Sequence, residues 1–463
     1  MLLTEGGDAR ITLEPATGLN RYLSAPYPRD IIAYSSSTVS DISPEAFAHL
    51  LPLVDQSADY AERLQHLRGR IRAAFSLSDD TRIVFAPSGT DLEYAALAAV
   101  FGKAAGGVHN VLLGADEIGS GCIHSARGRY FAGETALGLT VEPAGDVAGC
   151  EEITTVDVPV RCGAGQARES AEIIAEMARE IETARAAGKH CLVHGVHGSK
   201  TGLVLPGLHD IEALQARFGA DVTFVIDACQ ARITSTAIAE YLARGAIVLM
   251  TGSKFIGAPP FNGWALFPAA LMEAAAPLPS GFATIFRRAE WPEGWAGAEQ
   301  LPEGENLPLA LRLEAALFEA EKFQQLSMAE VSAIIAAFED ALAEHLISAL
   351  NVRRITPGGA AQEMPIEMRT LATIDVSNLP GLTTFEQAQS LHRELALEGV
   401  RLGQPVKCVA LDEGGWGGTL RIGLSMPQIT RWAAMDANDI AVELSRDMQK
   451  IAGLLQHLTT KTQ

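Results

Sequence analysis

Seven short apolar runs alternate with amphipathic stretches between residues 80 and 268, and this alternation constrains the fold more than any other feature of the chain. Between Arg168 and Ala187, for example, apolar side chains recur at helical spacing. Continuous apolar strands separated by helices are typical of a parallel sheet that is covered on both faces. We therefore predict a large α/β domain with a seven-stranded, mainly parallel sheet, whose strands are Arg82–Ala86, Asn110–Gly114, Ile153–Val158, His190–Val196, Val222–Ile226, Ala246–Met250 and Trp264–Phe267.

The pattern changes after residue 276 and divides the chain into parts. Residues 277–306 are rich in Pro, Gly and Trp and predict a loop. Beyond it we expect an α+β domain, with helices at Leu307–Leu350, Phe385–Leu397 and Gln428–Leu458 and strands at Thr370–Val376 and Leu420–Leu424. The expected parts are an N-terminal segment that packs across both domains (1–60), a large domain (61–306) and a small C-terminal domain (307–463).

The composition excludes several classes of protein. The 463 residues include 36 basic and 56 acidic side chains, which give a net charge of −20. Such a chain lacks the basic surface of a nucleic-acid-binding protein, and an anionic membrane would repel it. No apolar run is long enough for a membrane span, no secretory signal is visible, and the six cysteines lack C-x-x-C spacing. We expect a cytoplasmic protein with no metal, nucleic-acid or membrane partner.

Two polar motifs stand at the carboxyl ends of predicted strands, the edge where open α/β sheets bind ligands. Ser88-Gly89-Thr90 follows the strand RIVFA and begins a helix, so its free N–H groups could bind a phosphate; a simple helix cap at Thr90 would give the same pattern. Asp227 ends the strand VTFVI, where its carboxylate could pair with a buried cationic ring nitrogen or cap a helix.

Two basic residues complete the set. Lys254 follows the strand AIVLM beside the apolar loop 255–260, where burial could make its amine a nucleophile, although a surface lysine fits the same position. Arg421 lies inside the apolar strand TLRIGL, so it needs an anionic partner, either a substrate carboxylate held in bidentate fashion or a structural ion pair.

Taken together, the order of these motifs resembles the class V aminotransferase and cysteine desulfurase group of fold-type I enzymes, which depend on pyridoxal 5′-phosphate (PLP). The similarity spans residues 80–430, and its most specific part is Val222–Gly263, with Asp227-Ala-Cys-Gln230 at one strand end and Ser253-Lys254 at the next. The resemblance implies a large domain with a seven-stranded sheet and a smaller C-terminal domain, as the apolar pattern also predicts.

The resemblance also implies a role for each matched residue. Lys254 would carry PLP as a Schiff base and move the substrate α-proton, while Asp227 would pair with the pyridinium nitrogen. Gln230 would hydrogen-bond the phenolic oxygen of the cofactor, and Ser199 that oxygen or the substrate. The phosphate would be held by Ser88, Gly89, Thr90, Thr251 and Ser253, and the substrate by Arg421, Ser37 and Tyr22.

The chain departs from the family pattern at two places. The family usually stacks a histidine on the cofactor ring, but Glu117 or Ile118 falls at that position here, so the stacking residue is unassigned. Cys408 stands two residues beyond the position of the desulfurase cysteine, and its neighbours Val406 and Val409 predict a strand and a structural cysteine. The Gly-rich stretch Asp412–Gly418 is expected to be a lid or a substrate loop.

Members of this family build each active site from two subunits. Glu303-Gly304-Glu305-Asn306 occupies the place of the segment that reaches the partner's phosphate. The resemblance therefore implies a homodimer with shared active sites, in which Asn306 lies near the partner's cofactor.

The expected activity is that of a PLP-dependent enzyme acting on an α-amino acid through a quinonoid intermediate, with transamination the first expectation. A lyase or aldolase that cleaves a C–S or C–C bond at the β-position is the alternative, favoured by the missing histidine, and cysteine desulfuration comes third. A nucleotide-binding protein is the non-PLP alternative, because Gly198-Ser199-Lys200-Thr201 partly matches a P-loop, although the glycine before Lys200 is missing. Lys200 also lies in a second Gly-Ser-Lys sequence and is the rival of Lys254.

Overall fold

All seven predicted runs lie in one sheet. The computed structural model describes residues 2–54, 59–115, 117–119, 121–357 and 365–461. The sheet also contains an eighth strand of two residues, too short to be predicted from periodicity. Its strands are β2 (Arg82–Ala86), β3 (Val108–Leu113), β4 (Thr154–Val158), β5 (His190–His197), β6 (Val204–Leu205), β7 (Val222–Asp227), β8 (Ile247–Thr251) and β9 (Gly263–Phe267).

The order of the strands is β2-β9-β8-β7-β5-β3-β4, with β6 paired to β5. Strands β8, β7, β5, β3 and β4 run parallel, whereas β9 is antiparallel to both of its neighbours and β6 is antiparallel to β5. The carboxyl ends of the parallel strands therefore meet at one edge, where the predicted motifs follow them. The prediction of a mainly parallel sheet is confirmed.

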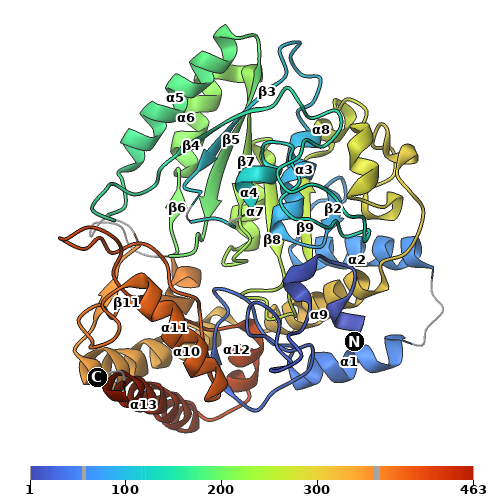
Figure 1. The fold of residues 1–463 in the computed structure, drawn as a ribbon. Helices are drawn as coiled ribbons and strands as arrows, with labels where there is room; N and C mark the ends of the chain where they lie inside the picture. The colour runs from blue at the N-terminus through green and yellow to red at the C-terminus, as the bar shows by residue number, and fades with distance from the viewer. Residues whose placement is uncertain (1, 55–58, 116, 120, 358–364, 462–463) are drawn as a thin grey trace.

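The sheet is buried on both faces because alternate side chains enter two separate cores. Ile83 and Phe85 of β2 pack in one core, and Val84 and Ala86 pack in the other. Figure 1 shows α5 and α6 on one side of the sheet and α3 and α8 on the other. The helices of this part are α3 (Gly89–Ala98), α4 (Cys122–Ser125), α5 (Ser170–Ala186), α6 (Leu208–Phe218), α7 (Ser235–Ala243) and α8 (Ala269–Glu273).

Residues 277–306 contain three short 3₁₀ helices, at Ser280–Thr284, Arg288–Glu290 and Ala298–Gln300, rather than a plain loop. Trp291 and Trp295 are buried here, with ring centroids 4.8 Å apart. The aromatic content of this segment therefore contributes to the core.

The C-terminal part is α+β, as predicted. Its strands β10 (Arg353–Ile355), β11 (Leu371–Asp375) and β13 (Thr419–Gly423) form an antiparallel sheet, and β12 (Val400–Leu402) pairs in parallel with β1 (Ile32–Tyr34) from the N-terminal segment. The helices are α9 (Leu307–Phe323), α10 (Met328–Leu342), α11 (Phe385–Leu397), α12 (Met426–Ala433) and α13 (Ala437–Lys461); a π-helix, Ala343–Ser348, extends α10.

Two of the predicted long helices are interrupted. The stretch from Leu307 breaks between α9 and α10, where Ser327 and Glu330 form a capping box that starts the second helix. The stretch from Gln428 breaks between α12 and α13. Apolar periodicity continues across both breaks, which explains why each stretch reads as one helix in the sequence.

The N-terminal segment contacts both parts of the chain. It contains α1 (Pro44–Val54), and α2 (Tyr60–Ala74) follows it. The buried Arg312 of α9 donates hydrogen bonds to the carbonyl oxygens of Glu5 at 2.7 Å, Gly6 at 3.2 Å and Leu3 at 3.3 Å, while β1 pairs with β12.

The domain boundaries at residues 60 and 306 stay predictions. No helix in the described ranges is long and apolar enough to cross a membrane.

Candidate active site

A cavity of about 600 Å³ lies at the carboxyl ends of the parallel strands. Segments that follow β2, β5, β7 and β8 line it, together with residues of the N-terminal segment and of the small C-terminal part. The site residues that the sequence predicted and that line this cavity are Tyr22, Ser37, Ser88, Gly89, Thr90, Ser199, Asp227, Gln230, Thr251, Ser253, Lys254 and Arg421.

Asn306 is the exception. It caps α9, since its Oδ1 accepts a hydrogen bond from the N–H of Leu309 at 3.1 Å, and its Nδ2 donates to the carbonyl oxygen of Gly6 at 3.0 Å. It is not among the described residues that line the cavity of its own chain. Its contact with a partner's cofactor stays a prediction.

The turn between β2 and α3 brings a helix N-terminus to the cavity. The cap of α3 is Ser88, whose Oγ accepts from the N–H of Asp91 at 3.3 Å and donates to Asp91 Oδ2 at 2.5 Å; it is not Thr90, as the sequence allowed. Gly89 is required for packing, because a Cβ atom there would lie 2.9 Å from the Sγ of Cys229. Free backbone N–H groups at a helix N-terminus can bind an anion, and Ser88, Gly89 and Thr90 of this turn line the cavity.

Asp227 is the last residue of β7. Its Oδ1 accepts a hydrogen bond at 2.9 Å from the N–H of Cys229, which orients the carboxylate. Behind it, Glu93 and His194 are each 1% exposed, with Oε2 and Nε2 3.5 Å apart. Burial and the charge of Asp227 raise the pKa of Glu93 well above its usual value, and burial lowers the pKa of His194 to about 3. His194 is therefore neutral at pH 7, and the shift of the Glu93 pKa favours its protonated form.

Lys254 follows β8 in a loop that the N-terminal segment holds in place. Its carbonyl oxygen accepts hydrogen bonds from Ser40 Oγ at 3.1 Å and from the N–H of Gly257 at 3.0 Å. The hydroxyl of Thr251 donates to the carbonyl oxygen of Cys229 at 2.7 Å. Thr251 thus has no proton left for a phosphate oxygen, although it lines the cavity as predicted.

The amide of Gln230 is oriented by its neighbours. Its Oε1 accepts a hydrogen bond at 2.8 Å from Nη1 of Arg232, and its Nε2 donates at 3.0 Å to the carbonyl oxygen of Ser37. One N–H of the amide is left for a ligand. Arg232 is fully buried over the ring of Phe255. Arg232 was not predicted as a site residue, although its position two residues after Gln230 was a visible signal.

Glu117 is held in a buried ion pair, so its side chain is not free to stack on a cofactor ring. Its Oε1 lies 2.7 Å from Nε of Arg161, and its carboxylate also accepts from Ser199 and Thr201. These contacts lower the pKa of Glu117 even though burial raises it. Ser199 Oγ donates to Glu117 Oε2 at 2.7 Å, so its proton is not available to a cofactor, and the predicted role of Ser199 has no support from this geometry.

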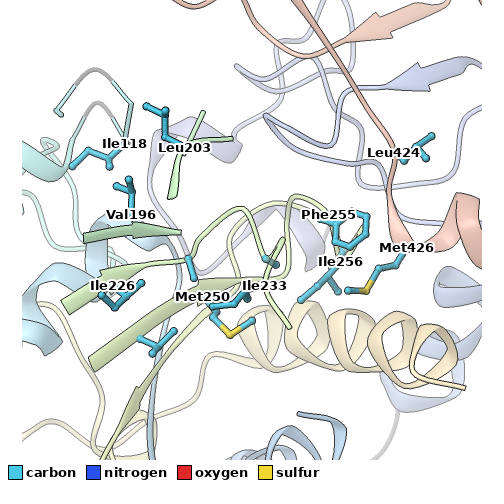
Figure 2. Packing of buried hydrophobic residues seen from close by; sticks show 14 of the residues in the cluster. Ile118, Val196, Leu203, Ile226, Ile233, Met250, Phe255, Ile256, Leu424 and Met426 are labelled. Carbon is cyan, nitrogen blue, oxygen red and sulfur yellow. The ribbon is translucent and has the colours of Figure 1, made fainter. Parts of the chain in front are cut away.

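Of the two residues at the expected stacking position, Glu117 and Ile118, Ile118 is the one with an apolar side chain. It lines the cavity and is 4% exposed, and Figure 2 shows it on the same side as Val196 and Leu203. No histidine is found among the described residues that line the cavity, and His124 on α4 lies outside this lining.

Arg421 is held by oxygen atoms of the protein rather than by a carboxylate. Nε donates to the carbonyl oxygen of Gln404 at 2.7 Å, and Nη1 donates to those of Ser37 at 3.0 Å and Lys200 at 3.1 Å. Nη2 donates to Thr38 Oγ1 at 3.0 Å. Burial lowers the pKa of Arg421 to about 10, so it remains a cation at pH 7. One N–H is left for a substrate, which corrects the expected bidentate geometry.

Two other cavity residues can contact a ligand. Ser37 Oγ is buried and has no hydrogen-bond partner in the described part of the chain. Lys200 lines the same cavity as Lys254, and burial together with the charge of Arg421 lowers its pKa to about 8.

The cysteines of the region are not thiolates. Burial raises the pKa of Cys122 and Cys229 in the cavity lining well above its usual value, and that of Cys408 to about 12. Cys408 is buried, as a structural cysteine would be, but it lies in a loop, so the expected strand is wrong. The stretch Asp412–Gly418 forms a tight hairpin and is not among the described residues that line the cavity. Its role as a lid or a substrate loop stays a prediction. No group of metal-ligating side chains is present among the described residues.

Comparison with solved structures identifies the fold. The chain is similar to a cysteine desulfurase from Thermococcus onnurineus NA1, with a TM-score of 0.58 and 12% identity over 93% of this chain and 95% of that one. It is also similar to a ureidoglycine–glyoxylate aminotransferase from Bacillus subtilis, with a TM-score of 0.54 and 12% identity over 94% and 98% of the two chains.

A third similar structure is that of a cystine C–S lyase in complex with cysteine persulfide, with a TM-score of 0.54 and 15% identity over 90% of this chain and 97% of that one. No protein-family model and no curated sequence matches the chain. The chain therefore has the fold of the fold-type I PLP-dependent enzymes, as the sequence predicted.

Proposed function

We propose that the protein is a PLP-dependent enzyme that acts on an α-amino acid, with Lys254 as the residue that binds the cofactor covalently. The observation that carries this proposal is the position of Asp227 and Lys254, which stand at the carboxyl ends of neighbouring parallel strands and line one cavity with the N-terminus of α3. A carboxylate, an amine and an anion-binding turn are the groups that a cationic ring, an aldehyde and a phosphate require.

The residues of the cavity fit this cofactor. Oδ1 of Asp227 is held by the N–H of Cys229, which leaves Oδ2 to pair with a pyridinium nitrogen. The free N–H of Gln230 and the hydroxyl of Ser37, which has no partner among the described residues, are further polar contacts for a ligand in the cavity.

PLP, when bound, withdraws electrons from the α-carbon of an amino acid. Lys254 would then move the α-proton on its Nζ, and the remaining N–H of Arg421 would bind the substrate carboxylate. Ile118 would exclude water from one face of the site. We propose transamination as the reaction, in agreement with the expectation from sequence.

A lyase acting at the β-position is the second candidate, and Lys200 is the observation that favours it. An amine with a pKa of about 8 in the cavity could give a proton to a leaving group at the β-carbon. Desulfuration with a cysteine persulfide is disfavoured, because the cavity thiols are protonated and Cys408 is not among the described residues that line the cavity.

The test is borohydride reduction of the purified protein followed by peptide mapping. We expect a yellow protein with a pyridoxyl group on Lys254, and Lys254→Ala should abolish the label while Lys200→Ala keeps it. A label on Lys200 would overturn the assignment. A colourless protein that binds no PLP would overturn the cofactor, and formation of a keto acid without an amino acceptor would favour the lyase.

A further inference from the structure

Arg10, from the N-terminal segment, lies at the turn that begins α3. Its Nη2 donates a hydrogen bond to Ser88 Oγ at 3.2 Å, and Arg10 lines the cavity. Asp8 fixes the guanidinium, with Nε 2.9 Å from Oδ1 and Nη2 2.7 Å from Oδ2. The rings of Phe131 and Phe261 each lie 4.9 Å from its Cζ. The cation is therefore held in position by side chains from four separate parts of the chain.

Two N–H donors of this guanidinium have no hydrogen-bond acceptor among the described residues. Nε and Nη2 are used by Asp8 and Ser88, whereas Nη1 makes no hydrogen bond to the described residues. An arginine with two free N–H donors and a fixed plane suits a phosphate group, which accepts hydrogen bonds on several oxygens.

Two of the hydroxyl groups that the sequence predicted to bind the phosphate already donate their protons to oxygen atoms of the protein. Ser88 gives its proton to Asp91, and Thr251 gives its proton to the carbonyl oxygen of Cys229. The hydroxyl of Ser253 lies 3.4 Å from Thr251 Oγ1. A phosphate with a charge of about −1.5 to −2 at pH 7 thus needs a further donor, and a charged one binds it more strongly than a neutral one.

We propose that Arg10 binds the phosphate group of the cofactor, together with the backbone N–H groups of Gly89 and Thr90. This inference rests on the proposed function and extends it, because it makes the N-terminal segment a part of the cofactor site. Asp8 is then a positioning residue, which acts by holding Arg10.

The test compares PLP with pyridoxal, which lacks the phosphate. Wild type and Arg10→Met are each titrated with both compounds, and bound chromophore is measured by absorbance after removal of free compound. We expect Arg10→Met to weaken the binding of PLP roughly 10- to 100-fold, the loss of one charged contact, and to leave the binding of pyridoxal within about twofold. Arg29→Met is the matched control, since Arg29 lies in the same segment and pairs with Asp41 at 2.9 Å, outside the described cavity lining.

Asp8→Asn serves as a second variant if Arg10→Met does not fold, because it keeps the guanidinium. It should weaken PLP binding by a smaller factor and leave pyridoxal binding unchanged. Equal binding of PLP by wild type and both variants, or an equal loss for PLP and pyridoxal, overturns the assignment of Arg10. A wild-type protein that binds neither compound overturns the proposed function and this inference with it.

Discussion

The carbonyl oxygen of Ser37 accepts a hydrogen bond at 3.0 Å from Nη1 of Arg421, which lies 384 residues later in the chain. The same oxygen accepts from Nε2 of Gln230 at 3.0 Å. One carbonyl group therefore joins the N-terminal segment, the large sheet and the last strand of the small sheet at the wall of the cavity.

Arg421→Lys should affect both the fold and the substrate. Lysine cannot reach all four oxygens that the guanidinium now binds, so buried acceptors lose their donors, at a cost of about 1–3 kcal/mol in the free energy of unfolding. We also expect KM for an α-amino acid to rise roughly 10- to 100-fold, the loss of one charged hydrogen bond, with the chromophore on Lys254 retained. Steady-state kinetics and urea unfolding measure the two effects.

The matched control for Arg421 is Arg68→Lys. Arg68 is buried and donates to the carbonyl oxygens of Ile83 and Ala289, but it is not among the described residues that line the cavity. It should lower stability without changing KM. If KM responds to neither substitution, Arg421 does not bind the substrate.

Gly89→Ala should disturb the turn at the start of α3. The new Cβ atom would lie 2.9 Å from Cys229 Sγ, and overpacking of this kind costs about 1–3 kcal/mol. Adding Cys229→Ala should restore most of the loss, and a double-mutant cycle measures the coupling. Gly453→Ala is the control: no atom lies within 4 Å of its Cβ in α13, so we expect a gain of roughly 0.5–1 kcal/mol. Additive effects of the Gly89 and Cys229 substitutions would contradict the close contact.

Glu319 should make the protein less stable as the pH rises. Burial raises its pKa from 4.5 to about 7, with Lys322 and a hydrogen bond from Ser43 opposing the shift. The stability that it contributes is present below pH 4.5 and is lost as the pH rises through about 7, on the order of 2–3 kcal/mol. Glu319→Gln should flatten this part of the profile when urea unfolding is measured between pH 5 and pH 8.

The exposed Glu305 provides the control for Glu319, since Glu305→Gln removes the same charge from the surface. It should leave the difference in stability between pH 5 and pH 8 within about 0.5 kcal/mol of wild type. A Glu319→Gln profile that follows wild type would show that this carboxyl titrates normally.

We expect a twofold homodimer, in which Asn306 lies near the cofactor of the partner subunit. Asn306→Ala should remove a helix cap, at about 1 kcal/mol, and also weaken PLP binding severalfold. Ser327→Ala removes the cap of α10 and should cost similar stability with unchanged PLP affinity. Light scattering gives the mass in solution, and a monomer with full activity would rule out the shared site.

The main sheet could be predicted because its determinants are local. Most strands from β2 to β9 lie in short runs rich in apolar residues, and helical spacing between the runs indicates a parallel sheet buried on both faces. Motifs at strand ends then converge, since parallel strands end at one edge. That is why Ser88, Asp227 and Lys254 were expected together and do line one cavity.

The tertiary structure alone decided which atoms those side chains bind. Arg10 reaches Ser88 across 78 residues, and Ser199 reaches Glu117 across 82. Local periodicity reports which face of an element is buried, but it carries no information on which distant polar group will lie opposite. The sequence therefore determined the sheet, the edge that holds the cavity and the residue types placed there. The donors left for a ligand depend on hydrogen bonds between distant segments, and only the packed chain shows where those bonds are made.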